Sequence, residues 1–365
     1  MASAAEDRWF MASALRLSRL HTGQTGTNPS VGCVVVKDGE VVGSAVTAPG
    51  GRPHAETQAL EIAGEKARGA TVYVTLEPCS HYGRTPPCAN ALVEAGVARV
   101  VISLTDPDPR VSGRGIAILR EAGIVVETGL MEEEGRRALA AYLTRQTKGR
   151  PHVTLKLAVS ADGMLGRRGE EVSITGPEAR AQVHRLRAEA DAILVGIGTV
   201  LSDDPELTVR ISGLEKRSPT RIVLDRRLEL PLDSRLVKSA RDVPVIVAAS
   251  PGSALSVEGG IPGDKREKLI EAGAEIMDAT ELDILLAILA VRGMSSLLVE
   301  GGATVAKAFL DASLVDRVLL FQGTGIVGEG GLESPLTPSD MPAGFKFVRE
   351  ESFGPDRCFE YERGF

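Results

Sequence analysis

The sequence predicts an α/β protein built from two domains, and three observations support this. The chain of 365 residues exceeds what one ordinary core supports, because single domains usually hold about 100 to 200 residues. Segments with the patterns of strands alternate with segments at helical spacing, which is typical of layered α/β folds. A break around Gly149 and Pro151 separates two such series. We therefore expect domains at residues 1–148 and 149–365.

The first domain is expected to open with a helix and a hairpin and to continue with alternating helices and strands. Phe10, Ala14 and Leu17 recur at helical spacing, and Asp38-Gly39 is a strong hairpin signal. The expected strands are 31–37, 40–46, 71–76, 99–103 and 124–127. The expected helices are 6–20, 54–67, 88–95, 113–122 and 131–145. This order predicts three layers around a mainly parallel sheet.

The second domain repeats the alternation and ends in a pair of strands. The expected strands before that pair are 152–160, 191–195, 221–225, 243–249, 297–300 and 315–321. The expected helices are 177–189, 264–272, 281–292 and 303–312, and the first of them has Pro177 in its first turn, where proline is favoured. Segments 345–353 and 358–363 follow a Gly/Pro-rich loop and predict an antiparallel hairpin on a mixed sheet.

Composition and charge argue against several classes of protein. The formal charge of −7 disfavours a nucleic-acid-binding surface, because affinity for phosphodiesters comes mainly from Lys and Arg. The longest apolar run, 284–291, is far short of the roughly 20 residues that span a bilayer. The start MASAAEDRWF does not resemble a signal peptide, and four cysteines are no disulfide framework. We expect a cytoplasmic protein that binds neither nucleic acid nor membrane.

The stretch from Pro53 to Cys88 has the residue types of a metal site. His54, Cys79 and Cys88 can supply three zinc ligands and leave one position open, as in catalytic zinc sites. Glu56 follows the histidine by two residues and is free to transfer protons. The chemistry that fits is hydrolytic deamination, in which hydroxide from zinc-bound water attacks a ring carbon bearing an amine. Both thiolates are expected near a helix N-terminus, where the dipole favours an anion.

This stretch also matches most of a known signature. Zinc deaminases carry H-x-E followed by P-C-x-x-C, with the Glu outside the ligand set. His54-Ala55-Glu56 and Pro78-Cys79 fit, but eight residues rather than two separate Cys79 from Cys88.

Two alternatives remain open at this point: a closed structural zinc with His81 as fourth ligand, or unrelated buried cysteines. Neither gives a reason for the glutamate. The other cysteines, Cys33 and Cys358, are predicted to be small core residues. The single histidines, His21, His152 and His184, are predicted to be ordinary surface or core residues.

Longer motifs in both halves carry a family resemblance. They are NPSVGCVVVKDGEVVG at 28–43, HAE at 54–56, TLEPCSHYGRTPPC at 75–88, DPDPRVSGRGI at 106–116, KLAVSADG at 156–163, DAILVGIGTVLSDDPELTVR at 191–210 and VEGGATVAKAFL at 299–310. Over nearly its whole length the chain resembles the bifunctional diaminohydroxyphosphoribosylaminopyrimidine deaminase and 5-amino-6-(5-phosphoribosylamino)uracil reductase of riboflavin synthesis. The insertion SHYGRTPP between the cysteines is its most specific part.

The resemblance implies a cytidine-deaminase-like three-layer domain followed by a dihydrofolate-reductase-like α/β domain. The first would use Zn²⁺ to deaminate 2,5-diamino-6-ribosylamino-4(3H)-pyrimidinone 5′-phosphate. The second would use NADPH to reduce the ribosyl group, giving 5-amino-6-ribitylaminouracil 5′-phosphate. The implied partner is this small molecule, and the implied assembly is a homo-oligomer.

The resemblance also assigns residues. It implies that His54, Cys79 and Cys88 hold zinc, that Glu56 is the proton shuttle, that Asn28 contacts the pyrimidine, and that Arg84 meets the ribose phosphate. The implied NADPH contacts are Ala158, Ser173, Thr199, Asp203, Arg226, Gly302, Ala303, Thr304, Val305, Ala306, Lys307 and Ala308. The implied contacts to the reductase substrate are Glu171, Arg187, Leu207, Arg210 and Glu300.

Some positions depart from the family pattern. Relatives often carry Asn at the position of Asp108, and an acid does not donate a hydrogen bond in the same way. The loop at 164–173 reads MLGRRGEEVS, where many relatives carry an Ala-Thr and a Ser-x-Trp. Arg226 stands where some relatives carry Ser, and a basic residue there would favour the extra phosphate of NADPH.

Without the resemblance, the sequence of the second half indicates less about its function. The glycine-rich segments at 196–199 and 301–304 would be plain turns, and Arg187 would form a solvated salt bridge. Two other functions are conceivable. One is a nucleoside or tRNA deaminase with an unrelated second half, and the other is a zinc-stabilised binding module with a degenerate reductase domain. The long cysteine spacer and the acidic charge oppose the first, and Glu56 opposes the second.

Overall fold

The computed structural model describes residues 3–82, 86–167, 170, 172–251, 264–279 and 281–364. The chain divides into two compact units, Met1–Gly149 and Arg150–Phe365, and each has its own sheet. The division expected from the sequence, after residue 148, lies one residue before this boundary. No helix in the described part of the chain is long and apolar enough to cross a membrane.

The first unit is built on a five-stranded sheet with the order β2-β1-β3-β4-β5. Its strands are β1 (Gly32–Lys37), β2 (Glu40–Val46), β3 (Thr71–Leu76), β4 (Arg99–Leu104) and β5 (Val125–Thr128). β1 runs antiparallel to β2 and β3, and the other pairs are parallel. Asp38 and Gly39 both have positive φ at the β1–β2 turn, as a type I′ hairpin turn requires. The predicted hairpin is confirmed, but the sheet is mixed rather than mainly parallel, with two antiparallel and two parallel pairs.

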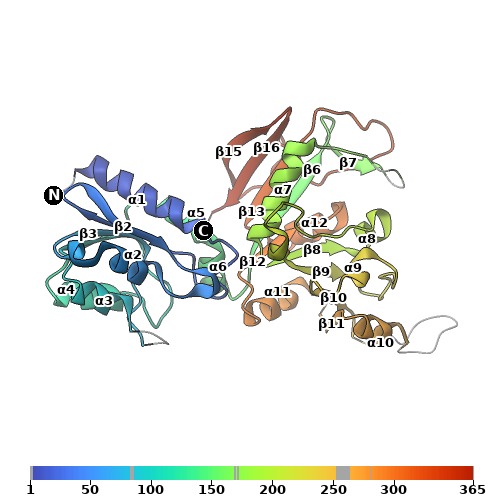
Figure 1. Cartoon of the computed structure of the whole chain (residues 1–365). Coiled ribbons are helices and arrows are strands. Elements are labelled where there is room, and N and C mark those ends of the chain that lie inside the picture. Colours follow the sequence, from blue (N-terminus) through green and yellow to red (C-terminus); the bar gives the residue numbers. More distant parts are fainter. Residues whose placement is uncertain are drawn as a thin grey trace. The chain divides into compact units, whose positions relative to one another are not determined.

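Helices cover both faces of this sheet (Figure 1). They are α1 (Ala4–Ser18), α2 (Ala55–Ala63), α3 (Cys88–Glu94), α4 (Arg114–Glu121), α5 (Glu132–Ala138) and α6 (Ala140–Lys148). On one face α1 buries Phe10 and Met11 against Val34 and Tyr73. On the other face α2, α3 and α4 bury small and aliphatic side chains against alternate residues of β1, β3 and β4. The predicted three layers are confirmed.

Two expected helices of this unit are wrong in extent. The helix expected at 131–145 is two helices that break at Leu139. Ala138 packs against the core under α1, whereas Leu139 and Tyr142 belong to the core on the other face, so the break lets the chain change faces. The helix expected at 54–67 ends at Ala63, because Gly64 takes a positive φ and begins a 3₁₀ turn.

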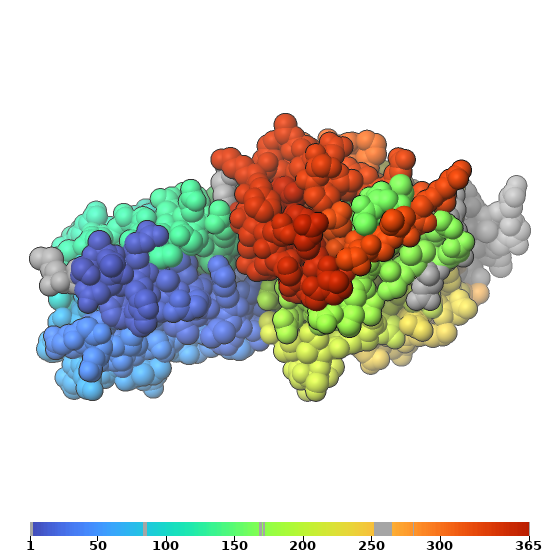
Figure 2. All heavy atoms as spheres, turned by 90° about the horizontal axis from the view of Figure 1, so that it is seen from above, coloured from blue at the N-terminus to red at the C-terminus, as the bar shows by residue number. Residues whose placement is uncertain are grey.

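The second unit contains a nine-stranded mixed sheet with the order β11-β10-β9-β8-β12-β6-β13-β16-β15. Its strands are β6 (His152–Val159), β8 (Ala192–Gly196), β9 (Thr220–Leu224), β10 (Val245–Ala249), β11 (Glu275–Asp278), β12 (Ser296–Val299), β13 (Arg317–Gln322), β15 (Phe345–Phe353) and β16 (Asp356–Arg363). The pairs from β11 to β13 are parallel, and β16 and β15 form the predicted antiparallel hairpin. Its residues, red in Figure 2, form part of one surface of this unit.

Helices flank this sheet as well. The unit also contains a small two-stranded sheet, which was not predicted from the sequence. The helices are α7 (Pro177–Glu189), α8 (Ile197–Asp203), α9 (Arg235–Lys238), α10 (Asp264–Glu271), α11 (Leu282–Val291) and α12 (Ala303–Asp311), and β7 (Met164–Arg167) pairs with β14 (Gly331–Glu333). One core lies under α11 and α12, and the other under α7, α9 and α10. The central strands β8, β10 and β12 are therefore buried on both faces, which explains their continuous apolar sequences, whereas the edge strand β15 is largely exposed.

Candidate site residues gather where parallel strands end. In the first unit, Cys79 follows β3 and Asp108 follows β4. In the second unit, Gly196 ends β8, Arg226 follows β9 and Gly301 follows β12. Parallel strands bring their carboxyl ends to one edge of a sheet, and ligands of such sheets bind at that edge.

A buried ion pair holds the first strand of the second unit. Both terminal nitrogens of Arg150 donate to Asp316, at 2.6 and 2.7 Å, and the backbone N–H of Val153 donates to the same carboxylate. The two side chains are only 14% and 7% exposed. Burial opposes ionisation, but the Arg150 guanidinium outweighs it and lowers the pKa of Asp316 to about 2.

We expect Asp316→Asn to lower the free energy of unfolding of the second unit by about 3 to 5 kcal/mol, because it leaves a buried arginine unpaired. The pKa of Asp316 is lower folded than unfolded, so its contribution is complete above about pH 4 and is lost as the pH falls towards 2. Urea unfolding from pH 7 to pH 2 measures this. Asp311→Asn, which removes an exposed pair with Lys307, is the control and should cost below about 0.5 kcal/mol. Equal losses in both variants, or a loss independent of pH, would contradict the prediction.

Candidate zinc centre and reductase site

Three predicted ligands meet in the first unit. One ligand atom from each of His54, Cys79 and Cys88 lies within 4.8 Å of the others. His54 immediately precedes α2, Cys79 lies in the loop after β3, and Cys88 is the first residue of α3. His81 is not part of this cluster, so within the described residues the site has three protein ligands and no fourth.

The spacing of these atoms fits zinc. Nδ1 of His54 lies 3.3 Å from Sγ of Cys88 and 3.7 Å from Sγ of Cys79. A tetrahedral zinc with ordinary Zn–N and Zn–S bond lengths holds neighbouring nitrogen and sulfur ligands about 3.5 Å apart. The donor set and its geometry therefore match a zinc site with an open fourth position.

The surroundings favour the thiolate form at Cys79 but not at Cys88. The backbone N–H of Cys88, at the start of α3, donates to Sγ of Cys79 at 3.3 Å. Hydrogen bonding from Cys88 lowers the pKa of Cys79 to about 4, while the same bond and burial raise the pKa of Cys88 well above its ordinary value. Cys79 is thereby prepared as a thiolate ligand, whereas Cys88 would have to lose its proton on binding zinc.

Glu56 lies beside the ligands but outside their set. It is in the first turn of α2 and is only 4% exposed. Burial raises its pKa to about 7, and the Cys79 thiolate adds to this effect while His54 opposes it. A carboxyl group that holds a proton near neutrality can both take up and give a proton.

The buried Cys33 and Cys358 are confirmed as core residues.

Glu77, which the sequence interpretation missed, anchors the metal loop. Its buried carboxylate accepts backbone N–H groups of Asp106, Gly113, Gly115 and Ile116 at 3.0 to 3.3 Å. The signal was its place directly before Pro78-Cys79. A Cβ at Gly115 would lie 2.0 Å from the Pro78 carbonyl oxygen, so only glycine lets α4 approach this loop so closely. The N-terminus of α4 thereby fixes where Cys79 lies.

The predicted pyrimidine contact is held near the zinc ligands. Nδ2 of Asn28 donates to the Gly51 carbonyl at 2.8 Å, and the hydroxyl of Thr25 donates to the Asn28 carbonyl. Gly51 comes three residues before His54, so the half-buried Asn28 belongs to the same end of the sheet. Two other predicted substrate contacts, Arg84 and Glu171, lie outside the described residues.

In the second unit, Arg187 and Glu300 meet directly. Nε and Nη2 of Arg187 donate to the two carboxylate oxygens of Glu300 at 2.7 and 3.0 Å. The side chains are 12% and 10% exposed, so the solvated salt bridge expected for Arg187 from sequence physics alone is wrong. Nη1 of Arg187 donates to the Thr208 carbonyl, and this segment also carries the buried Leu207 and the exposed Arg210. Arg187, Leu207, Arg210 and Glu300 thus occupy one region.

Lys156, also missed at the sequence level, completes this region. Its Nζ lies 3.8 Å from Oε2 of Glu300, and burial lowers the pKa of the ammonium group. Although burial opposes it, Arg187 and Lys156 hold the pKa of Glu300 below its ordinary value. Lys156 lies on β6, two residues before the half-buried Ala158.

The two glycine-rich segments lie side by side, and each is a short strand-to-helix turn. β8 ends at Gly196 and α8 begins at once, while α12 begins one residue after Gly302. A Cβ at Gly196 or Gly301 would come within 2.8 Å of Val305, so glycine permits the close packing. A Cβ at Gly302 would lie 3.9 Å from the hydroxyl of Thr199. The predicted NADPH contacts around Thr199 and Gly302 therefore converge.

Other predicted NADPH contacts differ in their surroundings. Ala306 is fully buried in the core, whereas Lys307 pairs with Asp311 on the surface. Asp203 and Arg226 are exposed. Ser173 is exposed and accepts a hydrogen bond from Arg180 at 3.0 Å. The predicted NADPH contacts therefore converge at the starts of α8 and α12, and less clearly at the 164–173 loop.

Comparison with known proteins covers both units. Residues 151–359 match the RibD C-terminal domain, and residues 4–104 match the cytidine and deoxycytidylate deaminase zinc-binding region. The riboflavin biosynthesis protein RibD of Aquifex aeolicus is 43% identical over 98% of both chains. That of Escherichia coli is 41% identical over 97% of this chain and 98% of its own.

Solved structures of related proteins are also similar to this chain over both units. Acinetobacter baumannii RibD aligns over the whole of both chains with a TM-score of 0.86 and 35% identity. A diaminohydroxyphosphoribosylaminopyrimidine deaminase/5-amino-6-(5-phosphoribosylamino)uracil reductase from Thermotoga maritima aligns over 99% of both chains, with a TM-score of 0.85 and 34% identity. These alignments span both units, and the first unit holds the zinc-site geometry described above. The chain therefore belongs to the RibD family of riboflavin biosynthesis proteins, which combine a zinc-dependent deaminase and an NADPH-dependent reductase in one chain.

Proposed function

We propose that this enzyme deaminates 2,5-diamino-6-ribosylamino-4(3H)-pyrimidinone 5′-phosphate and then reduces the ribosyl group to a ribityl chain. The observation that carries the proposal is the meeting of His54, Cys79 and Cys88 beside the buried Glu56, in a chain that also carries a RibD C-terminal domain. We assign deamination to residues 1–148 and reduction to 149–365, in line with the two compact units.

In the deamination, the protein's task is to place the ring and move protons. His54, Cys79 and Cys88 would hold the zinc, which when bound would supply a water of lowered pKa. Glu56 would take the first proton of the attacking water and pass it to the ring nitrogen. It would then take the proton of the newly added hydroxyl and pass it to the amine, which leaves as ammonia while the ring carbonyl forms. Its pKa near 7 suits a group that must be both base and acid. Asn28 donates to the pyrimidine.

In the reduction, NADPH supplies a hydride to the opened ribose. The backbone at the start of α12 and the hydroxyl of Thr199 would bind the cofactor's phosphates, because helix N-termini favour anions and the glycines there allow close approach. Arg187 and Glu300 orient the substrate. In the opened form C1′ is joined to the exocyclic nitrogen as an imine, so addition of hydride at C1′ leaves the electron pair on that nitrogen. Lys156, whose pKa burial lowers, would supply the proton that this nitrogen takes up.

A single assay separates this proposal from its rivals. The protein is incubated with the diaminopyrimidinone ribosyl phosphate, with and without NADPH, and the products are identified. Both steps support the proposal, deamination alone shows an inactive reductase, and no reaction favours a binding module. A nucleoside or tRNA deaminase with an unrelated second half is already opposed by the match of residues 151–359.

We also place the enzyme in the cytoplasm, since Cys79 and Cys88 must stay reduced to bind zinc and a reducing compartment keeps thiols free. The homo-oligomeric assembly stays a prediction of the sequence.

We expect Glu56→Gln to lower the rate of deamination by about 10²- to 10⁴-fold, because the amide cannot transfer the protons. Zinc content and the rate of the reductase step should not change, since both depend on other residues. Metal analysis and separate assays of the two steps measure this. Glu61→Gln, on the exposed side of α2, is the matched control and should behave like the unchanged enzyme. A Glu56→Gln enzyme that keeps its zinc and deaminates normally would refute the proposed role.

We expect Arg226→Ala to reduce the preference for NADPH over NADH by about tenfold, as for the loss of one hydrogen bond to a charged group. Arg226 is exposed two residues after the end of β9, at the edge where the glycine-rich turns lie. The ratio of kcat/KM for the two cofactors is the readout. Arg227→Ala is the control, because that side chain is 79% exposed and pairs with Glu229. An unchanged ratio in Arg226→Ala would exclude Arg226 as the residue that recognises the extra phosphate.

A further inference from the structure

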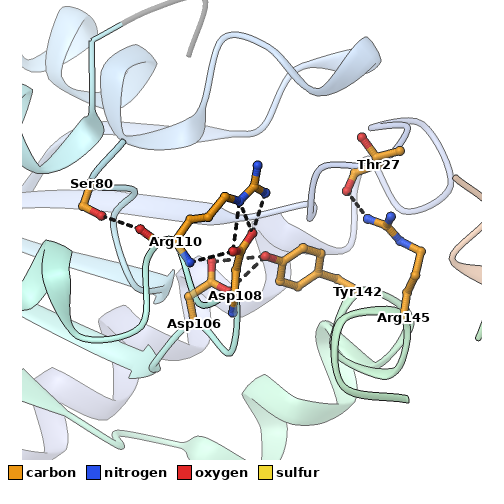
Figure 3. A network of polar contacts seen from close by, with 7 residues as sticks. All are labelled: Thr27, Ser80, Asp106, Asp108, Arg110, Tyr142 and Arg145. Atoms are coloured by element: carbon orange, nitrogen blue, oxygen red, sulfur yellow. Dashed lines mark hydrogen bonds and ion pairs between the residues drawn. The ribbon is translucent and has the colours of Figure 1, made fainter. Parts of the chain in front are cut away.

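The loop after β4 carries an unusual pair of charges. Asp108 is 5% exposed, and both of its carboxylate oxygens accept hydrogen bonds from Nε and Nη2 of Arg110 at 2.5 to 3.1 Å (Figure 3). The backbone N–H of Arg110 also donates to Asp108, at 2.9 Å. Hydrogen bonding from Arg110 holds the pKa of Asp108 below its ordinary value although burial opposes this. Asp108 is therefore ionised, and both of its carboxylate oxygens accept hydrogen bonds from a single guanidinium group, that of Arg110.

The surroundings fix this pair next to the metal loop. The backbone N–H of Asp108 donates to Asp106, whose carboxylate accepts the hydroxyl of Tyr142 at 2.9 Å. The hydroxyl of Ser80, the residue after Cys79, donates to the Arg110 carbonyl at 3.2 Å (Figure 3). The position of Arg110 is thus tied to the loop that supplies a zinc ligand.

Arg110 itself points to the outside. Its side chain is 69% exposed, and among the described residues its Nη1 has no hydrogen-bond partner. Here a buried carboxylate orients an exposed guanidinium. Most exposed ion pairs instead join two mobile surface groups and contribute little to stability. The outward N–H groups form a fixed donor pair of the kind that binds phosphate.

We propose that Arg110 is a specificity-determining residue of the deaminase that binds the 5′-phosphate of the substrate, and that Asp108 is the positioning residue that holds it. This rests on the substrate proposed above. The pyrimidine must reach the zinc ligands and Glu56, which is 4% exposed, so the ring enters first and the charged end stays at the rim. An exposed arginine on that edge meets the charged end. An ionised Asp108 can only accept hydrogen bonds, so Arg110 is the donor that this pair presents to a ligand.

The test compares Arg110→Gln with the unchanged enzyme on the phosphorylated substrate and on its dephosphorylated form. We expect KM for the phosphorylated substrate to rise about ten- to hundredfold, the range for losing a hydrogen bond to a charged group, with kcat unchanged. KM for the dephosphorylated form should not change. Inorganic phosphate should inhibit the unchanged enzyme competitively and the variant much less.

Two further variants keep the test decisive. Arg110→Lys retains the cation and should restore part of the phosphate inhibition even if Arg110→Gln folds poorly. Arg120→Gln, an exposed arginine on α4, should leave both KM values unchanged. Reductase activity and zinc content report folding in every variant.

Specific outcomes overturn the proposal. If Arg110→Gln and Arg110→Lys leave KM for the phosphorylated substrate unchanged, or raise KM equally for both substrates, Arg110 does not bind the phosphate. If the unchanged enzyme itself fails to deaminate the phosphorylated substrate, the proposed function fails instead.

Discussion

The constraint on which both sites depend is the meeting of parallel strands at one edge of a sheet. β3 and β4 end beside each other, so the loops with Cys79 and Asp108 are neighbours although their sequences are separate. β1 runs antiparallel to β3, which brings the Asn28 loop to the same edge. In the second unit, β8, β9, β12 and β6 end together and bring Thr199, Gly302 and Glu300 into one region. The sheets, rather than any single motif, assemble the chemistry.

Close backbone contacts then make the zinc position rigid. Four backbone N–H groups bind Glu77, and Gly115 lets α4 touch the Pro78 carbonyl, so Cys79 cannot move without disturbing a helix terminus. Cys88 is itself a helix start whose N–H donates to Cys79. A catalytic metal site works only if its ligands and proton shuttle keep their geometry, and these contacts supply that rigidity. The glycine turns at Gly196 and Gly301 serve the second unit in the same way.

Sequence reasoning succeeded where the signal is local. The strand β3 and the helix α7 have the predicted bounds, and the ligands His54, Cys79 and Cys88 follow from residue type and spacing. It failed where tertiary packing decides. The break at Leu139 occurs because the chain crosses between two cores, and Glu77 binds groups 29 to 39 residues away. Lys156 looked like an ordinary strand residue until β12 placed Glu300 beside it. Asp108 and Arg110 lie two residues apart in the sequence, but their pairing and the burial of Asp108 depend on how the loop packs.

The central claim is that the first unit holds an open catalytic zinc with two sulfur ligands and one nitrogen ligand. X-ray absorption at the zinc edge of the full chain measures this ligand set directly. We predict one zinc per chain, bound by two sulfur atoms, one imidazole nitrogen and one oxygen that exchanges with solvent. A fourth protein ligand, such as a second imidazole from His81, would contradict the account, because it would close the position that deamination needs.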